Sequence, residues 1–304
     1  MVHLPPAMDS AFEALLIYLR QSHNFDFTAY KRPSLMRRVQ HRMQMIKIGS
    51  YSDYDEYIKA NPQEFNCLFS TIEINVTSFF RDINAWKYIA GSIIPRIIAS
   101  KAANEQIRVW NAGCASGEET YTLAILLAEA LGVEQFCARV KIYSTDIDQE
   151  ALSQARLGNY FSREIVGISP TFLQKYFEQV DERYIFNQDL RRSLVFARHN
   201  IIEDAPMSKI DLLVCRNVLI YLDSESQTKA LARFHFSLRN NGFLFLGTSE
   251  MLPAHTNFFT SINLQQRVFT KVPKSDTNQR SLHKALSSQH KDRLSNSSRS
   301  KSEM

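Results

Sequence analysis

The 304 residues of this chain are 44% hydrophobic and carry a formal net charge of +5, a composition typical of a globular protein that buries an extensive core. The four cysteines, Cys67, Cys114, Cys137 and Cys215, lie in unrelated apolar segments, which argues against a disulfide framework or a cysteine-based zinc site. No run approaches the roughly 18 apolar residues of a membrane span, and the first residues lack the pattern of a signal peptide, so we expect a cytoplasmic protein.

The first part of the chain reads as helical. Apolar residues recur at helical spacing within residues 10–59, and a further helical segment spans residues 62–74. Within the second helical pattern, Ser34 is placed to cap a helix and Gly49 is placed to stop it. We therefore expect an all-α N-terminal domain over residues 1–83.

One face of the second helix is cationic. It carries Arg37, Arg38, His41 and Arg42, and no acid occurs between residues 28 and 52. Such a run is often only a solvated helix face. Because its charge is unbalanced, it also suits the docking of an acidic surface. We take the three arginines as candidates for substrate docking, and the sequence leaves both interpretations open.

From residue 84 to residue 272 the pattern changes to strands alternating with helices. After a helix near residues 84–100, the expected strands are residues 107–111, 140–145, 194–198, 210–215 and 242–247, with helices near 118–131, 149–155 and 224–238. Strands separated by helices imply right-handed crossovers and a doubly wound, mostly parallel sheet. Residues 264–272 could add an antiparallel edge strand. The sequence thus predicts an α/β domain.

Two segments depart from this alternation. Residues 158–193 contain a short strand pattern around Tyr184, which predicts a small hairpin excursion in place of a crossover helix. Residues 273–304 hold seven Lys or Arg and three Asp or Glu, a surplus that accounts for most of the net charge. Their polar composition predicts a disordered basic tail.

The segment from Ile107 to Tyr121 combines a strand, a loop bracketed by Gly113 and Gly117, and an acidic helix start. This arrangement is typical of proteins that hold a nucleotide-like ligand at the carboxyl end of a strand. The glycine spacing matches neither the dinucleotide fingerprint nor the phosphate loop of NTPases, which disfavours both classes. Taken alone, the loop could equally be a tight packing turn.

Polar residues also follow the other expected strands. Asp146 is placed to accept the ribose hydroxyls of an adenosine, whereas Asp148 is better placed to cap the next helix. Asn200 with Ile201 could hold an adenine, and Arg216 follows a fourth strand. Several polar strand ends at one edge of a sheet predict a ligand pocket there.

Four segments carry a family resemblance: NVTSFFR at residues 75–81, NAGCASGEE at 111–119, TDID at 145–148 and CRNVLIY at 215–221. They resemble the motifs of the CheR family of chemotaxis receptor methyltransferases, in order and over residues 12–272. The resemblance implies a class I S-adenosylmethionine-dependent methyltransferase domain with a small antiparallel β subdomain, joined to the all-α domain that helps to recognise the receptor. It implies methylation of receptor glutamates on cytoplasmic helices by a monomer, without nucleic acid, membrane insertion or a metal.

The resemblance also implies roles for individual residues. Cofactor contacts are implied for Asn75, Thr77, Arg81, Gly113, Glu119, Asp146, Asn200, Ile201, Arg216 and Asn217. Arg81, Arg216 and Tyr221 are implied to lie near the reacting carboxylate.

The residues themselves support a carboxylate substrate. A free glutamate titrates near 4.3, so its methylation needs orientation by an arginine but no general base. Arg81 and Arg216 are the candidates, although either could instead form a structural ion pair. The motif of amine methyltransferases, [DNS]PP[YFW], is absent after residue 215. The alternatives are a methyltransferase of another substrate and a non-catalytic cofactor-sensing adaptor. The family resemblance makes the loop of the hairpin bear on receptor tethering, and the short segment at residues 176–184 therefore implies action independent of a tether.

Overall fold

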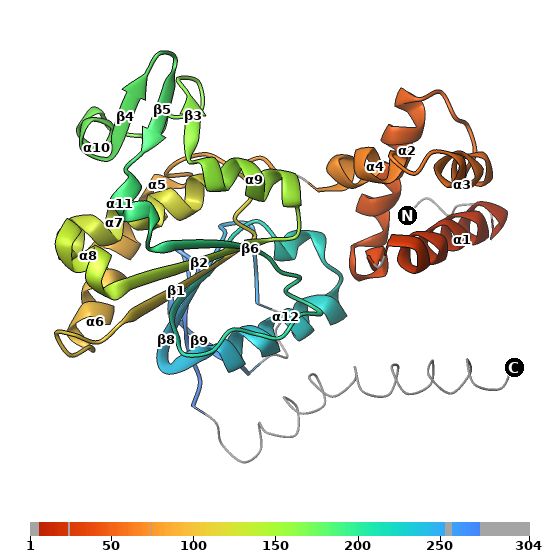
Figure 1. Cartoon of the computed structure of the whole chain (residues 1–304). Helices are drawn as coiled ribbons and strands as arrows, with labels where there is room; N and C mark the ends of the chain where they lie inside the picture. Colours follow the sequence, from red (N-terminus) through yellow and green to blue (C-terminus); the bar gives the residue numbers. More distant parts are fainter. Residues whose placement is uncertain (1–5, 24, 74, 253–256, 274–304) are drawn as a thin grey trace, which may run out of the picture. The chain divides into compact units, whose positions relative to one another are not determined.

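The computed structural model describes residues 6–23, 25–73, 75–252 and 257–273 (Figure 1). The chain divides into two compact units. Among the described residues, the helical unit comprises those within 6–75 and 221–226, and the sheet unit comprises those within 76–220 and 227–273. The sequence placed the domain boundary later, after residue 83, and the extent of the functional domains stays a prediction. The predicted tail lies outside the described residues.

The helical unit contains α1 (Pro6–His23), the short 3-10 helix η1 (Phe27–Ala29), α2 (Arg32–Met45), α3 (Tyr51–Ala60) and α4 (Glu64–Ile72). An aromatic cluster fills its centre, with Phe27 in contact with the rings of Phe25, Phe65 and Phe69. This burial orders the unit, because each helix has one apolar face and cannot bury it alone.

Both predicted ends of the second helix were wrong. α2 begins at Arg32 with Lys31 as its N-cap, so Ser34 lies inside the helix. The reason is Pro33, whose ring holds φ near the helical value and suits the first helical turn. The helix ends at Met45, and Lys47 adopts a left-handed φ of 60°, so the chain leaves the helix before it reaches Gly49.

The sheet unit is built on seven strands in the order β6-β2-β1-β7-β8-β10-β9. Their bounds are β1 Ile107–Ala112, β2 Val140–Asp146, β6 Leu194–Arg198, β7 Ile210–Cys215, β8 Leu238–Leu246, β9 Phe259–Asn263 and β10 Val268–Lys271. The first five pair in parallel, and β10 pairs antiparallel with both β8 and β9. This confirms the α/β prediction. The strand expected over 264–272 corresponds to β10, which is antiparallel as expected but lies inside the sheet, because β9 takes the edge.

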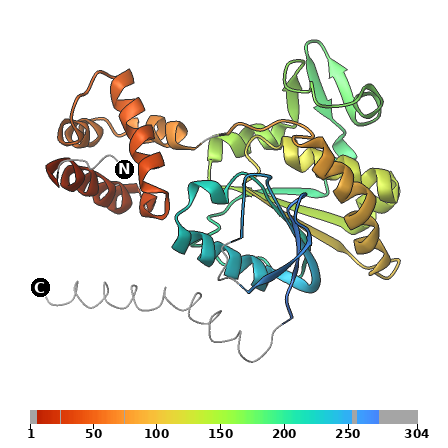
Figure 2. The same ribbon diagram turned by 180° about the vertical axis from the view of Figure 1, so that it is seen from behind.

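Helices cover the sheet on both sides (Figures 1 and 2). They are α5 (Ile83–Tyr88), the π-helical turn η2 (Ile89–Ile93), α6 (Ile94–Ala99), α7 (Glu118–Leu131), α8 (Val133–Arg139), α9 (Gln149–Leu157) and α12 (Ser224–Ser237). Alternation along β1 explains the two layers. Val109 joins the core cluster that includes α7 residues, while Trp110 packs edge-on against Phe234 of α12.

Residues 158–193 form the predicted β subdomain. Strands β3 (Asn159–Phe161), β4 (Phe177–Val180) and β5 (Arg183–Phe186) make an antiparallel sheet in the order β3-β5-β4, flanked by α10 (Pro170–Tyr176) and α11 (Gln188–Arg191). Val180 pairs with Arg183, so β4 and β5 are joined by a two-residue turn at Asp181 and Glu182. The short loop expected from the sequence is confirmed.

Within the described part of the chain, no single helix has the length and apolar composition needed to cross a membrane, although α7 and α8 taken together across a bend of 115° do.

Candidate cofactor and active site

The loop between β1 and α7 is held tightly against the neighbouring strand ends. The N–H groups of Gly113 and Cys114 both donate to the Thr145 carbonyl, at 2.7 and 3.0 Å. Gly113 has a φ of +82°, and a Cβ there would come within 2.2 Å of Val218 Cγ2. Only glycine meets both requirements at low cost, so the backbone rather than a side chain forms this wall.

Asp146 organises the same loop. Its Oδ2 accepts from the Ala115 N–H at 2.7 Å, and its Oδ1 accepts from the Asp148 N–H at 3.0 Å. Burial raises the pKa of this carboxyl above its ordinary value. A carboxylate offers about four acceptor positions, so the loop leaves capacity for a ligand's hydroxyls. Asp148 caps α9 through the N–H groups of Glu150 and Ala151, as predicted.

Arg216 forms a buried ion-pair triad at the end of β7. Its guanidinium lies 2.5 Å from Asp82 Oδ2 and 3.0 Å from Glu119 Oε2, and its side chain is 1% exposed. The same group lies over the rings of Trp86 and Phe245. The structure thus matches the structural ion pair that the sequence left open, and Arg216 holds Glu119 in place.

Arg81 has the opposite character. Its side chain is exposed, and its guanidinium donates to the Val76 carbonyl at 2.9 Å. Burial raises the pKa of Glu119, while Arg216 and, more weakly, Arg81 lower it. Both arginines therefore act on one carboxyl, and of the two Arg81 is the one that solvent reaches. This makes Arg81 the better candidate to meet an incoming carboxylate.

The remaining predicted cofactor residues differ in how the structure places them. Asn200 uses its side-chain oxygen within its own loop, where Oδ1 accepts from the Ile202 N–H at 2.9 Å, and Ile201 beside it is buried. Thr77 belongs to the sheet unit. Asn75 and Tyr221 are grouped with the helical unit, so their contacts with a cofactor stay predictions.

Glu250 is a site residue that the sequence analysis missed. This buried carboxylate accepts from the N–H groups of Val218 at 2.9 Å, Leu219 at 2.8 Å and Gly247 at 2.5 Å. It thereby clamps the turn after β7, in which Asn217 adopts a left-handed φ of 60°. The available signal was an acid four residues after the end of β8, comparable to Asp146 at the end of β2.

Strained backbone gathers around this site. Among the described non-glycine residues with positive φ are Phe80, Asp82, Ala115 and Asn217. Each costs of order 1–3 kcal/mol and persists only where the surroundings enforce it. Strain of this kind is typical of ligand-binding loops.

The buried polar groups beneath the loop fit a polar cofactor. Asn111 is fully buried, and its Nδ2 donates to Thr120 Oγ1 at 3.1 Å. Its Oδ1 has no partner among the described residues. A buried acceptor without a partner is rare in folded proteins and indicates an absent donor. Together with the backbone wall at Gly113 and the acid at Asp146, it suits a ligand that carries hydroxyl and amino groups.

The predicted docking arginines of α2 separate into two kinds. Arg42 forms a bidentate pair with Glu64 at 2.7 Å for each bond, and Tyr54 donates to the same carboxylate at 2.9 Å. This interaction belongs to the interior of the helical unit, so a docking role does not fit Arg42. Arg38 donates to the Thr71 carbonyl at 3.4 Å. Arg37 is exposed and has no partner among the described residues.

Comparison with known families gives two matches. The family described as "CheR methyltransferase, SAM binding domain" matches residues 75–268, and "CheR methyltransferase, all-alpha domain" matches residues 10–72.

Curated relatives agree with these matches. A chemotaxis protein methyltransferase of Listeria innocua is 31% identical over 77% of this chain and 87% of its own length. The chemotaxis protein methyltransferase of Salmonella typhimurium is 30% identical over 80% and 84%. An uncharacterized 104.1 kDa protein of Rhodobacter capsulatus is 34% identical over 88% of this chain, which spans only 28% of that protein. A solved methyltransferase from Mesorhizobium loti is 14% identical over 52% and 54% of the two chains with a TM-score of 0.28, too low to carry an argument.

Proposed function

The chain belongs to the CheR methyltransferase family, and on that premise we propose that it transfers a methyl group to glutamate side chains on the cytoplasmic helices of chemoreceptors. The cofactor is S-adenosylmethionine, which supplies an electrophilic methyl group, and the products are a glutamate methyl ester and S-adenosylhomocysteine. The observation that carries the glutamate assignment is the exposed guanidinium of Arg81 beside the buried Glu119–Arg216 pair.

A carboxylate nucleophile explains this arrangement. A glutamate is already an anion at neutral pH, so the site needs to orient it rather than deprotonate it. An exposed guanidinium can hold a carboxylate through two parallel hydrogen bonds and fix its approach. Arg216 cannot do this while its two terminal nitrogens hold Asp82 and Glu119. We therefore give Arg81 the substrate contact and Arg216 a positioning role.

The strand ends would hold the cofactor. Asp146 would accept the ribose hydroxyls, and the backbone at Gly113 would lie against the methionine part. Glu119 would face the same part of the cofactor, and the Asn200–Ile201 and Asn217 loops would border the adenosine. Thr77 is proposed to complete the wall beside Arg81. Asn75 and Tyr221 are proposed to join the site from the adjoining segments.

Substrate docking is proposed for the outer face of α2, with Arg37 and Arg38 as its cations. Their charge suits an acidic receptor surface, since long-range attraction between opposite charges speeds encounter. The two-residue turn between β4 and β5 leaves no loop to hold a receptor tether. We expect the enzyme to act as a monomer without such a tether, and micromolar binding of receptor C-terminal peptides would contradict this.

The deciding experiment is incubation of the full chain with radiolabelled S-adenosylmethionine and receptor cytoplasmic fragments. We expect label on glutamate that mild base releases as methanol, since it would be held as a carboxyl ester. Label stable to mild base would exclude a carboxyl ester and would overturn the proposal. Cofactor binding without transfer to any fragment would support the adaptor alternative.

A further inference from the structure

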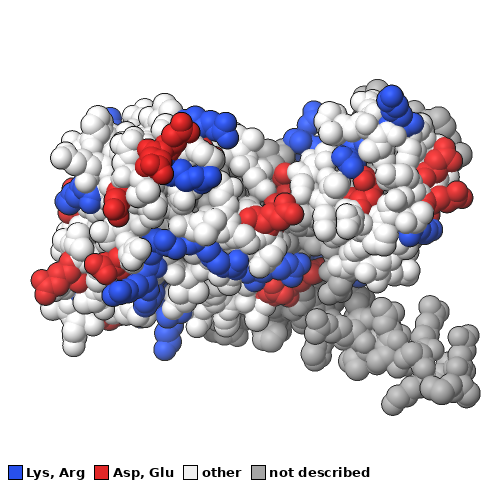
Figure 3. Space-filling model, turned by 45° about the horizontal axis from the view of Figure 1, so that its top comes forward, with Lys and Arg blue, Asp and Glu red and all other residues white. Residues whose placement is uncertain are grey.

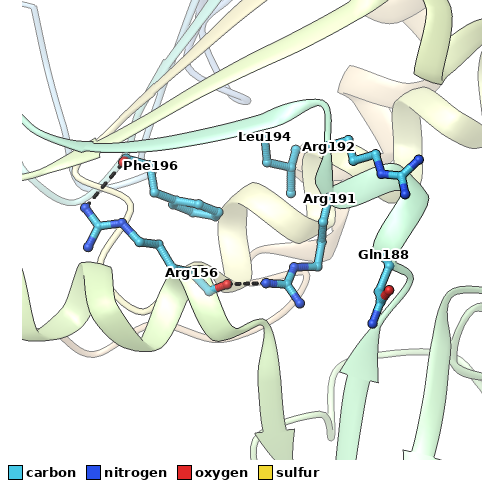
Figure 4. Close-up of a pocket in the computed structure, with 6 residues that line it drawn as sticks. All are labelled: Arg156, Gln188, Arg191, Arg192, Leu194 and Phe196. Atoms are coloured by element: carbon cyan, nitrogen blue, oxygen red, sulfur yellow. Dashed lines mark hydrogen bonds between the residues drawn. The ribbon is translucent and has the colours of Figure 1, made fainter.

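A second, strongly cationic cavity lies away from the strand-end site. It has a volume of about 580 Å³ and sits between the end of α9, α11 and the edge strand β6 (Figure 4). Its lining residues are Arg156, Gln188, Arg191, Arg192, Leu194 and Phe196. None of them has a role in the proposed methyl transfer. The volume falls within the range of about 300–1,000 Å³ typical of small-molecule sites.

The charge of this cavity is not balanced from within. Arg156 donates to the Phe196 carbonyl at 3.3 Å, and Arg191 donates to the Arg156 carbonyl. These bonds use one of the five N–H donors of each guanidinium. Arg192 meets Asp189 at 3.4 Å, a pair in which both side chains are largely exposed and which therefore contributes little. Figure 3 shows Lys and Arg side chains gathered in a band across one face of the sheet unit.

The floor of the cavity is apolar. Leu194 and Phe196 are two residues apart on β6, so their side chains project to the same side of the strand. Both point into the cavity (Figure 4). The Phe196 ring is half-buried, lies 6.0 Å from the ring of Tyr121 and borders the cavity near the arginines (Figure 4). An aromatic ring near arginines suits a planar base, which can stack on either kind of group.

One backbone carbonyl of the edge strand is already occupied. Among the described strands β6 pairs only with β2, and the Phe196 carbonyl accepts from Arg156. A peptide strand added there would have to compete with this bond. The cavity is thus better suited to a compact anion with a planar part than to an extended acidic peptide.

We propose that this cavity binds a nucleotide carrying at least two phosphate groups. The three guanidiniums would hold the phosphates, since their planar fork matches phosphate oxygens. Phe196 would stack the base, and Gln188 would contribute the neutral hydrogen-bonding group at the rim. Bound there, the nucleotide would bridge α9 of the sheet unit and α11 of the β subdomain.

The test is calorimetric titration of the full chain with ATP and GTP in the absence of divalent metal. We expect binding that persists with saturating S-adenosylhomocysteine and weakens roughly tenfold or more in Arg192→Gln and Arg191→Gln. Arg192 is 81% exposed, so its variant should fold normally. The matched control is Lys87→Gln, which removes one exposed positive charge from α5. Phe196→Leu should weaken nucleotide binding but not the binding of inorganic pyrophosphate.

Several results would overturn the proposal. Displacement by S-adenosylhomocysteine would place the nucleotide in the strand-end site. Equal losses of nucleotide affinity in Arg192→Gln and Lys87→Gln would mean that binding depends on the net charge of the protein and not on this cavity. Pyrophosphate binding as tight as ATP binding would leave only an inorganic anion site. Loss of receptor-fragment binding in Arg192→Gln, without nucleotide binding to the wild type, would assign the cavity to protein docking.

Discussion

Arg216 and Glu119 form a buried ion pair with 3.0 Å between guanidinium nitrogen and carboxylate oxygen, although 97 residues separate them in the chain. Asp82 completes the group from a third segment, 134 residues from Arg216. Two acids thus share one arginine that solvent scarcely reaches. The end of β7 and the starts of α7 and α5 are held together by this contact, which positions the wall of the proposed active site.

Arg216→Gln should destabilise the sheet unit. Removing the cation leaves Glu119 buried without its partner, and breaking a buried pair costs roughly 3–5 kcal/mol. We expect a matching loss in the free energy of unfolding, measured by chemical denaturation with Trp86 and Trp110 as fluorescent probes. An unchanged unfolding midpoint would show that the triad contributes nothing to the fold.

Arg81→Gln should leave stability intact and slow the reaction. The side chain is exposed, so its loss costs little folding free energy. If it orients the substrate carboxylate, kcat should fall on the order of a hundredfold while cofactor affinity changes little. Lys87→Gln is the matched control and should retain full activity. Equal rates for Arg81→Gln and wild type would remove Arg81 from the mechanism.

Gly113→Ala should damage both the fold and cofactor binding. A side chain at this left-handed φ costs roughly 1–2 kcal/mol, and the new Cβ would meet Val218 Cγ2 at 2.2 Å. Adding Val218→Ala removes the clash but not the backbone strain. We expect the double variant to recover part of the lost stability and S-adenosylhomocysteine affinity. No recovery at all would mean that the clash is relieved elsewhere.

Glu250→Gln should loosen the turn after β7. The amide replaces one accepting oxygen with a donor, so at least one backbone N–H loses its partner at a cost of roughly 1–3 kcal/mol. Because that turn carries Asn217, cofactor affinity should fall as well. Glu182→Gln, in the exposed turn between β4 and β5, is the control and should change neither the free energy of unfolding nor the cofactor affinity.

The Arg42–Glu64 pair should make the helical unit sensitive to acid. Burial alone would raise the pKa of Glu64, but hydrogen bonds from Arg42 and Tyr54 outweigh it and hold the pKa below the ordinary value of 4.5. Because its pKa is lowered on folding, the ionised Glu64 stabilises the folded state at pH values above 4.5. This contribution is lost as the pH falls through the pKa of the folded state. The protection of α4 amides against hydrogen exchange, taken relative to the intrinsic exchange rate at each pH, should therefore fall on acidification. Glu64→Gln should exchange faster at neutral pH and show a smaller acid response.

Local sequence patterns predicted most elements of the sheet unit. β6, β7 and α7 span the residues expected for them, because each is a mainly apolar segment with polar or glycine residues on either side. α8 was missed: the predicted helix stopped near residue 131, whereas the structure places a second helix directly after Gly132. The ends of α2 were misjudged because a proline in the first turn outweighs a serine placed after it.

The sequence by itself determined the fold class, the strand ends that carry polar residues and the loop that requires Gly113, because these depend on spacing along the chain. Only the tertiary structure decided which cations are free. Arg42 and Arg216 look like Arg37 and Arg81 in the sequence, but Glu64, Glu119 and Asp82 neutralise the first two. An ion pair depends on where two distant segments meet, and local patterns do not encode that meeting.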